Sequence, residues 1–332
     1  MMVRVWFNHW FSSAYDLIEL LKQDNPELYV IGSSTTADSV VKLACDEWHQ
    51  EPAEVEGYID FCIDFCRKNR IDVFFPRKNL ELVSKFKDRF TDLGVKVLID
   101  DYPVVSLLND KAKTYGFLKN IKGLNIPEYH IVNNAREFEE AYEKISEKGG
   151  FACVKFVRDE GAMSYRRIVK GKKGFDRLRT YPGVEMLYDD YLACLSEKES
   201  FDDLMVMEYL PGREISVDCL ATEQGPIIIP RFKSFGRAEL VDFDPSIVSL
   251  CESILDRTKL ECPCNVQFKE KDGIPYLLEI NTRMSGGLQM SCLAAEINIP
   301  RIAYNKLIGK NERWSMKKIR TTLSFVEAPK IL

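Results

Sequence analysis

The first hundred residues alternate between short apolar runs and amphipathic stretches, and this alternation constrains the fold more than any other feature. Runs rich in β-branched and aromatic residues occupy 3–7, 28–31, 71–75 and 95–99. Stretches with helical periodicity occupy 14–23, 57–69 and 79–93. Alternating strands and helices are typical of a parallel sheet covered by helices. The sequence therefore predicts an N-terminal parallel α/β domain.

The turn after the first predicted strand lacks the glycines of a dinucleotide site. Residues 8–13 read Asn-His-Trp-Phe-Ser-Ser, where a pyrophosphate-binding turn would have the pattern G-x-G-x-x-G. Without those glycines the backbone is poorly suited to approach phosphates closely. We therefore expect nucleotide phosphates to bind elsewhere in the chain.

The remainder of the chain has a different pattern. Residues 100–110 are interpreted as a hinge, and helices are predicted for 111–122 and 135–148, with a strand at 151–157. From residue 204 onward, apolar runs typical of strands predominate. This order predicts an α+β region built on an antiparallel sheet.

Charge and cysteine content exclude several classes of protein. The 332 residues carry 46 basic and 51 acidic side chains, a formal net charge of −5. No global positive field is present to hold nucleic acid or an anionic membrane. The ten cysteines are scattered, and the three histidines lie far from the closest cysteine pairs, so free thiols are favoured over zinc ligands. We expect a cytoplasmic protein.

Polar side chains on two strands near the C-terminus form the strongest chemical signal. Strand alternation puts Gln267 opposite its apolar neighbours, and it puts Glu279 and Asn281 on one face of the next strand. Oxygen donors of this kind suit Mg²⁺ that is shared with substrate phosphates. Arg283 follows two residues later and can neutralise a phosphate or carboxylate. A solvated polar face of a hairpin is the alternative reading for any one of these residues.

The segment from NVQF at 265–268 to LLEINTRMSGGLQMSCLAAEINIP at 277–300 resembles the metal-binding end of ATP-grasp enzymes. Within them it is most similar to the carbamoyl-phosphate-synthetase-like branch, and the resemblance covers about residues 1–310. It implies an N-terminal pre-ATP-grasp domain (1–105) and a small subdomain with a phosphate loop (106–200). A C-terminal subdomain with the metal and substrate site (201–312) and an extension (313–332) complete the expected organisation.

The same resemblance implies roles for upstream residues. Glu208, Tyr209 and Leu210 match the hinge that meets adenine, and Glu214 matches the acid that holds the ribose. Lys111 and Lys155 match the two phosphate-binding lysines, and Gly161 and Ser164 lie in the expected phosphate loop. Arg231 and Lys233 lie where relatives place a basic group against the transferred phosphoryl group. The loop departs from many relatives in having one glycine, which provides fewer flexible amides for the phosphates.

The resemblance implies an ADP-forming ligase that uses ATP and Mg²⁺ (or Mn²⁺) to activate a carboxylate as an acyl phosphate for attack by an amine. Arg283 and the 285–287 backbone are expected to hold the carboxylate. Residues 8–13, 33–36, 76–80 and 284–290 are expected to set specificity, and relatives commonly form homodimers. Phosphorylation of bicarbonate or carbamate and a non-catalytic nucleotide-binding module are the alternatives.

Overall fold

The structure is a computed structural model, and it describes residues 2–8, 11–52, 56–147, 151–159, 163–171, 183–234, 236–310, 312–326 and 328–332. The chain divides into two compact units. The first unit contains residues 1–108, 213–267 and 280–332, and the second contains 109–212 and 268–279. Because each unit is assembled from separate segments, the predicted linear domain boundaries at 105, 200 and 312 stay a prediction.

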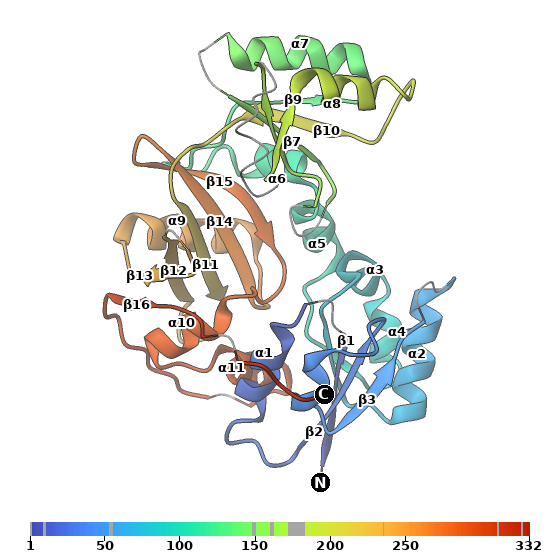
Figure 1. The fold of residues 1–332 in the computed structure, drawn as a ribbon. Helices are drawn as coiled ribbons and strands as arrows, with labels where there is room; N and C mark the ends of the chain where they lie inside the picture. The colour runs from blue at the N-terminus through green and yellow to red at the C-terminus, as the bar shows by residue number, and fades with distance from the viewer. Residues whose placement is uncertain are drawn as a thin grey trace. The chain divides into compact units, whose positions relative to one another are not determined.

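The N-terminal part of the first unit is a parallel five-stranded sheet among the described residues, which confirms the predicted α/β class. Its strands are β1 (Val3–Asn8), β2 (Leu28–Ser34), β3 (Glu47–Gln50), β4 (Val73–Pro76) and β5 (Lys96–Val97). The spatial order is β3-β2-β1-β4-β5, and every printed pair is parallel. All carboxyl ends of the strands therefore meet at one edge (Figure 1).

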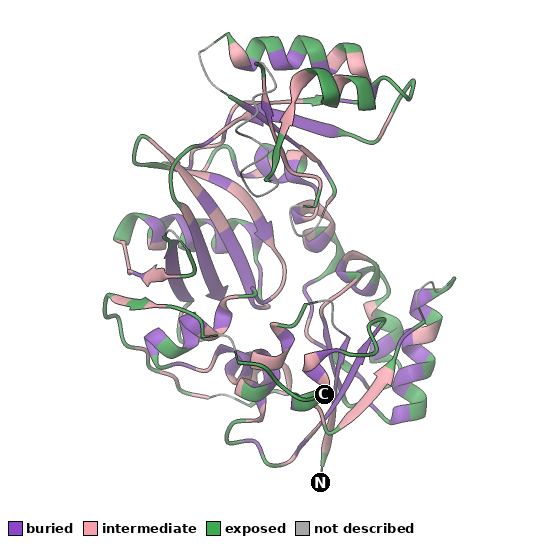
Figure 2. Ribbon diagram, in the orientation of Figure 1, coloured by how far each residue is buried: buried purple, intermediate pink, exposed green. Residues whose placement is uncertain are grey.

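Aromatic side chains on β1 fill the two faces of this sheet. Trp6 stacks on Phe74 at 4.0 Å and on Phe65 of α2 at 4.5 Å, measured between ring centroids. Phe7 points to the opposite face, as alternation requires, and stacks on Phe75 at 4.8 Å. Burying each of these rings contributes about 1.5–3 kcal/mol. Buried residues accordingly follow the central strands in Figure 2.

The helices of this region form where helical periodicity predicted them, and one predicted stretch is divided in two. Helices α1 (Ala14–Lys22) and α2 (Tyr58–Asn69) form where predicted, and a 3₁₀ helix covers Val40–Ala44. The helical pattern predicted for 79–93 forms two helices rather than one, because the chain breaks at Phe86 into α3 (Leu80–Lys85) and α4 (Lys87–Thr91). The boundary between the two units falls between Leu108 and Asn109, inside the predicted hinge at 100–110. Helix α5 (Tyr102–Leu108) occupies it and buries Val105 and Leu108.

The second unit contains a mostly antiparallel sheet of β6 (Tyr129–Val132), β7 (Ala152–Phe156), β8 (Arg166–Val169), β9 (Glu185–Leu187) and β10 (Leu204–Glu208). Their order is β6-β10-β7-β8-β9, with β8 and β9 parallel. Helix α6 (Lys111–Leu118) begins after a side-chain cap from Asp110. Helix α7 (Ala135–Ser146) packs on the sheet through Phe138 and helix α8 (Tyr188–Leu195) through Leu195, and α7 exposes its outer side (Figure 2).

A third sheet runs in the order β15-β14-β11-β12-β13-β16. These strands are β11 (Glu214–Leu220), β12 (Ile227–Lys233), β13 (Glu239–Val241), β14 (Cys264–Lys271), β15 (Ile274–Asn281) and β16 (Thr321–Leu323). Helices α9 (Pro245–Thr258), α10 (Leu288–Ala295) and α11 (Ile299–Leu307) accompany it. The sequence predicted mainly strands after residue 204 and missed α9, which Asp244 caps and Pro245 starts.

Within the first unit, the N-terminal sheet and this third sheet share one hydrophobic core. Phe7 and Leu17 from the N-terminal segment belong to the same buried cluster as Leu220, Leu288 and Ile302. Asn298 reinforces the packing, because its side-chain amide donates to the Leu20 carbonyl at 2.6 Å. Segments more than 250 residues apart in sequence are thus held together.

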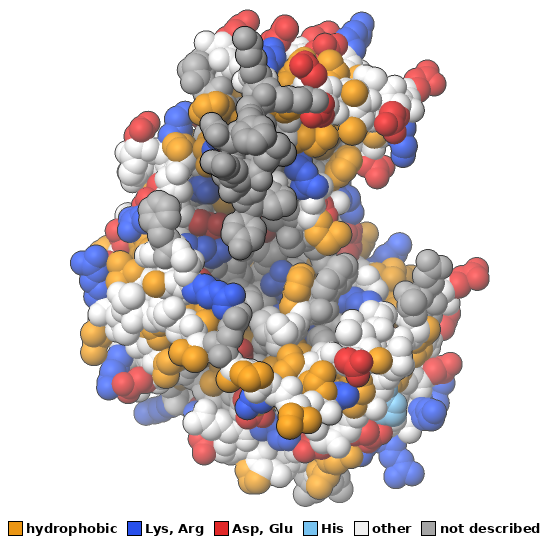
Figure 3. Space-filling view, in the orientation of Figure 1, with side chains coloured by type: hydrophobic (Ala, Val, Ile, Leu, Met, Phe, Trp, Pro, Cys, Tyr) orange, Lys and Arg blue, Asp and Glu red, His pale blue; other side chains and the backbone are white. Residues whose placement is uncertain are grey.

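Basic and acidic side chains of the described residues are interspersed on the face shown in Figure 3. This distribution agrees with the small net charge of −5. None of the helices in the described part of the chain combines the length and apolar character needed to cross a bilayer.

Candidate active site

Two lysines of the second unit converge near the end of β15. Lys111 begins helix α6, and its ammonium group lies 2.9 Å from the carbonyl oxygen of Asp159 and 3.8 Å from a carboxylate oxygen of Glu279. Lys155, on β7, donates to the Leu278 carbonyl at 3.4 Å. The structure therefore brings together three residues that the sequence placed in one site: Lys111, Lys155 and Glu279.

The electrostatics of this cluster favour an additional negative charge. Burial lowers the pKa of Lys155 to about 8, with the Glu279 carboxylate opposing the shift and the Lys111 ammonium adding to it. Lys111 is itself buried, with 6% of its surface exposed. Two cations thus share one nearby carboxylate in a region partly removed from water, where charges interact more strongly than in solution.

The predicted adenine hinge, residues 208–210, lies at the end of β10 in the same unit. Glu208 ends β10, and its carboxylate accepts the Glu128 backbone N–H at 3.0 Å and pairs with Lys271 at 2.5 Å. Tyr209 donates its backbone N–H to the Phe151 carbonyl at 2.7 Å, and the following Leu210 is buried. The Glu208 backbone is held as well, because its N–H donates to the Glu128 carbonyl at 3.0 Å, so this residue is fixed in place through both its side chain and its main chain.

An aromatic and cationic cluster beside this hinge was not identified from sequence. The guanidinium of Arg167 lies 5.0 Å from the ring centroids of both Phe151 and Tyr209, in cation–π geometry. Next to it, the Cys153 thiol donates to the Glu208 carbonyl at 3.6 Å, and burial raises the pKa of this thiol to about 11. Arg167 and Phe151 are 16 positions apart in sequence, so no local motif predicted their contact.

The predicted phosphate loop is described only in part. Gly161 lies outside the described residues. Ser164 accepts the Phe156 backbone N–H through its hydroxyl oxygen at 3.0 Å and donates its own N–H to Asp159 at 2.8 Å. These residues line a pocket of about 900 Å³ in the second unit.

In the first unit, Arg231 is the centre of a buried polar network on the face of β11 and β12. Its guanidinium is 2% exposed and pairs with the carboxylates of Asp218, at 3.0 Å, and Glu239. It also donates to three serine hydroxyls, those of Ser216, Ser285 and Ser291, at 2.9–3.2 Å. Burial alone would lower the pKa of Arg231, but the two carboxylates hold it above its ordinary value.

Gln267 joins this network through a neighbour that the sequence did not reveal. The Gln267 amide donates to the Asn265 side-chain oxygen at 3.2 Å. Asn265 is buried and donates in turn to Ser216 and Asp218, each at 3.0 Å. Asn265 and Gln267 share a face of β14 because they are two positions apart. The alternation of polar residues on β14 could have identified Asn265 from the sequence. Its partners on β11 could not be predicted in this way, because they are 47–49 residues away.

Lys233 and Glu214, predicted for different roles, form an ion pair with each other. Lys233 lies at the end of β12, with 43% of its side chain exposed. Arg231 is two residues earlier on the same face but is buried. The structure therefore separates the two basic candidates, one inside the network and one at its edge.

The predicted residues divide between the units. Those in the second unit are Lys111, Lys155, Ser164, Glu208, Tyr209, Leu210 and Glu279, while those in the first are Glu214, Arg231, Lys233, Gln267, Asn281 and Arg283. Glu279 and Asn281 share one face of β15. Among the described residues, no cluster of three or more histidine, cysteine or acidic side chains has the arrangement of a metal site. The predicted metal ligands Gln267, Glu279 and Asn281 include two amides, so they are not a cluster of histidine, cysteine or acidic side chains.

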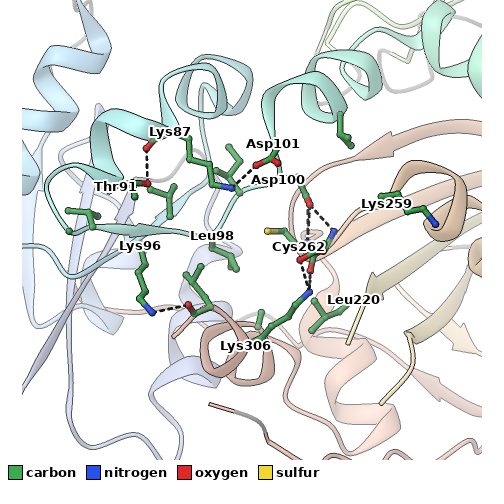
Figure 4. Close-up of a pocket in the computed structure, with 18 residues that line it drawn as sticks. Lys87, Thr91, Lys96, Leu98, Asp100, Asp101, Leu220, Lys259, Cys262 and Lys306 are labelled. Carbon is green, nitrogen blue, oxygen red and sulfur yellow. Dashed lines mark hydrogen bonds and ion pairs between the residues drawn. The ribbon is translucent and has the colours of Figure 1, made fainter. Parts of the chain in front are cut away.

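A separate pocket of about 850 Å³ in the first unit contains none of the predicted residues (Figure 4). Asp100 projects there and accepts the backbone N–H groups of Glu261 and Cys262 at 2.7 and 3.2 Å. Lys87 pairs with Asp101 at 2.9 Å, and Lys306 donates to the Glu261 carbonyl at 2.9 Å. The polar groups that Figure 4 labels at this pocket bond mainly with one another, which favours a structural role.

Comparison with known proteins places the fold. Residues 200–329 match the family model described as ATP-grasp in the biosynthetic pathway with Ter operon. The biotin carboxylase domain of Hydrogenobacter thermophilus 2-oxoglutarate carboxylase superposes with a TM-score of 0.69 at 16% identity, over 96% of this chain and 72% of that one. The chain has the fold of ATP-grasp enzymes and contains an ATP-grasp domain, as the sequence predicted.

Two curated relatives sharpen the comparison. The chain is 22% identical to the carbamoyl phosphate synthase large chain of Clostridium perfringens over 356 aligned positions, 91% of this chain. It spans only 31% of that relative's length. It is 23% identical to the D-alanine–D-alanine ligase of Fervidobacterium nodosum, over 66% of this chain and 71% of the ligase. The chain is homologous to both proteins.

Proposed function

We propose that this protein is an ADP-forming ligase that uses ATP and Mg²⁺ to activate a carboxylate as an acyl phosphate and then joins it to an amine. The observation that supports this most strongly is the convergence of Lys111 and Lys155 on the end of β15 beside Glu279. Phosphoryl transfer depends mainly on positioning and on neutralising phosphate charge. Two enclosed cations beside a carboxylate provide both.

The charged residues of this cluster fit a nucleoside triphosphate. Lys111 and Lys155 carry one positive charge more than Glu279 balances, so polyphosphate oxygens would complete the cluster. The hinge residues Glu208, Tyr209 and Leu210 would lie against adenine, and Glu214 could hold the ribose if it left Lys233. The structurally similar biotin carboxylase domain was solved with MgADP and bicarbonate, which supports the same ligand class for this chain.

The donor set also fits a hard divalent cation. Glu279 would supply a carboxylate, and Asn281 and Gln267 would supply amide oxygens, the ligand types that Mg²⁺ shares with phosphates. Mn²⁺ accepts the same donors. When bound, the ion would offset the negative charge that accumulates on the phosphate oxygens. The amide of Gln267 is oriented by its hydrogen bond to Asn265.

The proposed reaction has two steps. A substrate carboxylate oxygen forms a bond to the γ-phosphorus as the bond to ADP breaks, giving an acyl phosphate. The amine nitrogen then attacks the acyl carbon, phosphate leaves with the bonding electrons, and the nitrogen loses a proton. Arg283 and the 285–287 backbone would hold the carboxylate, and no side chain of the protein becomes covalently modified.

A screen for ADP release tests this function. Purified protein with ATP and Mg²⁺ is incubated with pairs of carboxylic acids and amines, and turnover that needs both partners is the expected result. Glu279→Gln removes the carboxylate and should lower ADP release by at least about 100-fold, as for loss of a charge-stabilising group. Glu252→Gln, at an exposed position of α9, is the matched control and should keep full activity. Unchanged turnover in Glu279→Gln would contradict the assignment.

Bicarbonate is the second candidate for the acceptor of the phosphoryl group. The alignment with carbamoyl phosphate synthase over 91% of this chain favours it. ADP release that depends on bicarbonate and needs no other carboxylate would identify this reaction. Tight ATP binding without ADP release from any acceptor would instead indicate a non-catalytic nucleotide-binding module.

A further inference from the structure

A basic side chain lies at the carboxyl edge of the parallel sheet, where open α/β sheets bind their ligands. Strands β1 and β4 are neighbours there, and their last paired residues are Asn8 and Pro76. Arg77 follows directly after β4. The sequence marked 76–80 only as part of a specificity region and gave Arg77 no role.

The backbone of Arg77 is fixed by a buried hydrogen-bond chain. Its N–H donates to the Asn8 side-chain oxygen at 2.7 Å, and Asn8 is fully buried. The Asn8 amide nitrogen in turn donates to the Tyr58 hydroxyl at 2.6 Å. A side chain that leaves such a fixed backbone position loses less conformational freedom when it binds a ligand.

The guanidinium groups of Arg77 and Arg283 donate hydrogen bonds to the same backbone oxygen. Arg77 Nη1 donates to the Met284 carbonyl at 2.8 Å, and Arg283 Nη1 donates to the same oxygen at 3.1 Å. Burial, followed by the charge of Arg283, lowers the pKa of Arg77 below its ordinary value. Two cations converge on an uncharged acceptor, an arrangement that an anion would stabilise.

Glu51, an acid near this edge of the sheet, is engaged by other residues. The carboxylate of Glu51 is buried and pairs with Lys78 at 2.7 Å while it accepts the Ser33 hydroxyl at the same distance. Within the described part of the chain, no carboxylate lies within ion-pair distance of Arg77. The Glu51 carboxylate therefore balances the charge of Lys78. The charge of Arg77, in contrast, is repelled by the charge of Arg283.

The turn after Arg283 packs against the start of α1. A Cβ added at Gly286 would lie 3.6 Å from the Ser13 hydroxyl oxygen, so this turn packs near the start of α1. Ser285 holds the turn by accepting the Gly287 N–H at 3.2 Å. Segments from β1, β4 and β15 thus meet within the first unit.

We propose that the substrate whose carboxylate is activated carries a second anionic group, a carboxylate or a phosphate, and that Arg77 binds this group beside Arg283. The inference rests on the proposed function, in which Arg283 holds the reacting carboxylate. One guanidinium matches one carboxylate or phosphate in a two-bond fork. Two adjacent guanidiniums therefore match two anionic groups, and Arg77 determines specificity.

Matched acid pairs test this proposal. Aspartate with asparagine and O-phosphoserine with serine differ in the second anion, and each is assayed for ADP release with the amine panel. Wild type should prefer the doubly anionic member by at least about tenfold in kcat/KM. Arg77→Met should lower kcat/KM for that member about 10- to 100-fold and change the neutral member less than about threefold. Arg77→Lys, which keeps the charge but loses the fork, should fall between them.

Calorimetric titration of the same acids into the protein keeps the two proposals separate. Tighter binding of the doubly anionic acid, lost in Arg77→Met and kept in the exposed control Arg67→Met, is the expected result. Equal affinity for both members of every pair, or an equal loss for both in Arg77→Met, would overturn the second-anion inference. Absence of ADP release from every acid would contradict the proposed ligase activity, while the titration still decides the role of Arg77. The carboxylate and phosphate pairs show which anion is preferred.

Discussion

Arg231 and Lys155 are both cations carried by β-strands, but their partners differ. Arg231 is enclosed by the carboxylates of Asp218 and Glu239, and its pKa is raised. Lys155 donates to a backbone carbonyl, and both it and Lys111 lie near the single carboxylate of Glu279. Burial lowers the pKa of Lys155 to about 8. A cation satisfied by protein carboxylates holds the fold together. One that lacks full compensation is suited to a ligand's negative charge.

Arg231→Met gives the largest expected effect on stability. The substitution leaves Asp218 buried without its cation, and breaking a buried pair in this way costs about 3–5 kcal/mol. The free energy of unfolding, measured by urea titration, should fall by that amount.

Lys233→Met is the control, since this residue is partly exposed and its pair with Glu214 is worth at most about 1 kcal/mol. Similar losses in the two variants would remove the distinction between a structural and an exposed cation.

Gly287→Ala tests how tightly the Arg231 network is packed. An added Cβ would lie 2.7 Å from the guanidinium carbon of Arg231, too close for an ordinary contact. Overpacking of this kind costs about 1–3 kcal/mol.

Gly286→Ala is the adjacent control, because among the residues that the structure describes its Cβ meets only the Ser13 side chain, at 3.6–3.8 Å. Thermal unfolding should show a lower midpoint for Gly287→Ala alone, and equal midpoints would argue against the packing described.

Lys155→Met should separate stability from activity. The folded pKa of about 8 lies below the value of about 10.4 expected when unfolded, so the charged lysine costs folding free energy at neutral pH. The variant should unfold no more easily than wild type at pH 7, with a gain of up to about 3 kcal/mol, and it should lose ADP release.

As pH rises from about 8 to 10.4, wild type should regain stability relative to this variant, because the lysine becomes neutral. A variant that is strongly destabilised at pH 7 would show that Lys155 supports the fold as Arg231 does. The exposed Lys113→Met serves as a control for loss of charge.

Tyr115→Phe should have the smallest effect. The Tyr115 hydroxyl donates to the Leu278 carbonyl at 2.7 Å, the same oxygen that Lys155 approaches. Its removal should cost about 0.5–1.5 kcal/mol of unfolding free energy. ADP release should change little, and a large loss of activity would mean that the hydroxyl positions Lys155.

The sequence predicted elements whose signals are local and missed contacts that depend on distant segments. Periodicity identified α2, whose apolar residues repeat at helical spacing, but it did not show that the helical pattern of 79–93 breaks at Phe86. Alternation placed Gln267, Glu279 and Asn281, whereas the Asp218 and Asn265 partners of the network come from separate strands. Arg77 and Arg283 are likewise brought together only by the fold, across 206 positions of sequence.

The central claim, activation of a carboxylate by phosphorylation, can be tested by following oxygen. A carboxylic acid that supports ADP release is labelled with ¹⁸O in its carboxylate, and the inorganic phosphate is examined by mass spectrometry. Attack of the carboxylate on the γ-phosphate predicts one ¹⁸O atom in each phosphate released. Phosphate free of the label would contradict an acyl phosphate and, with it, the proposed ligase.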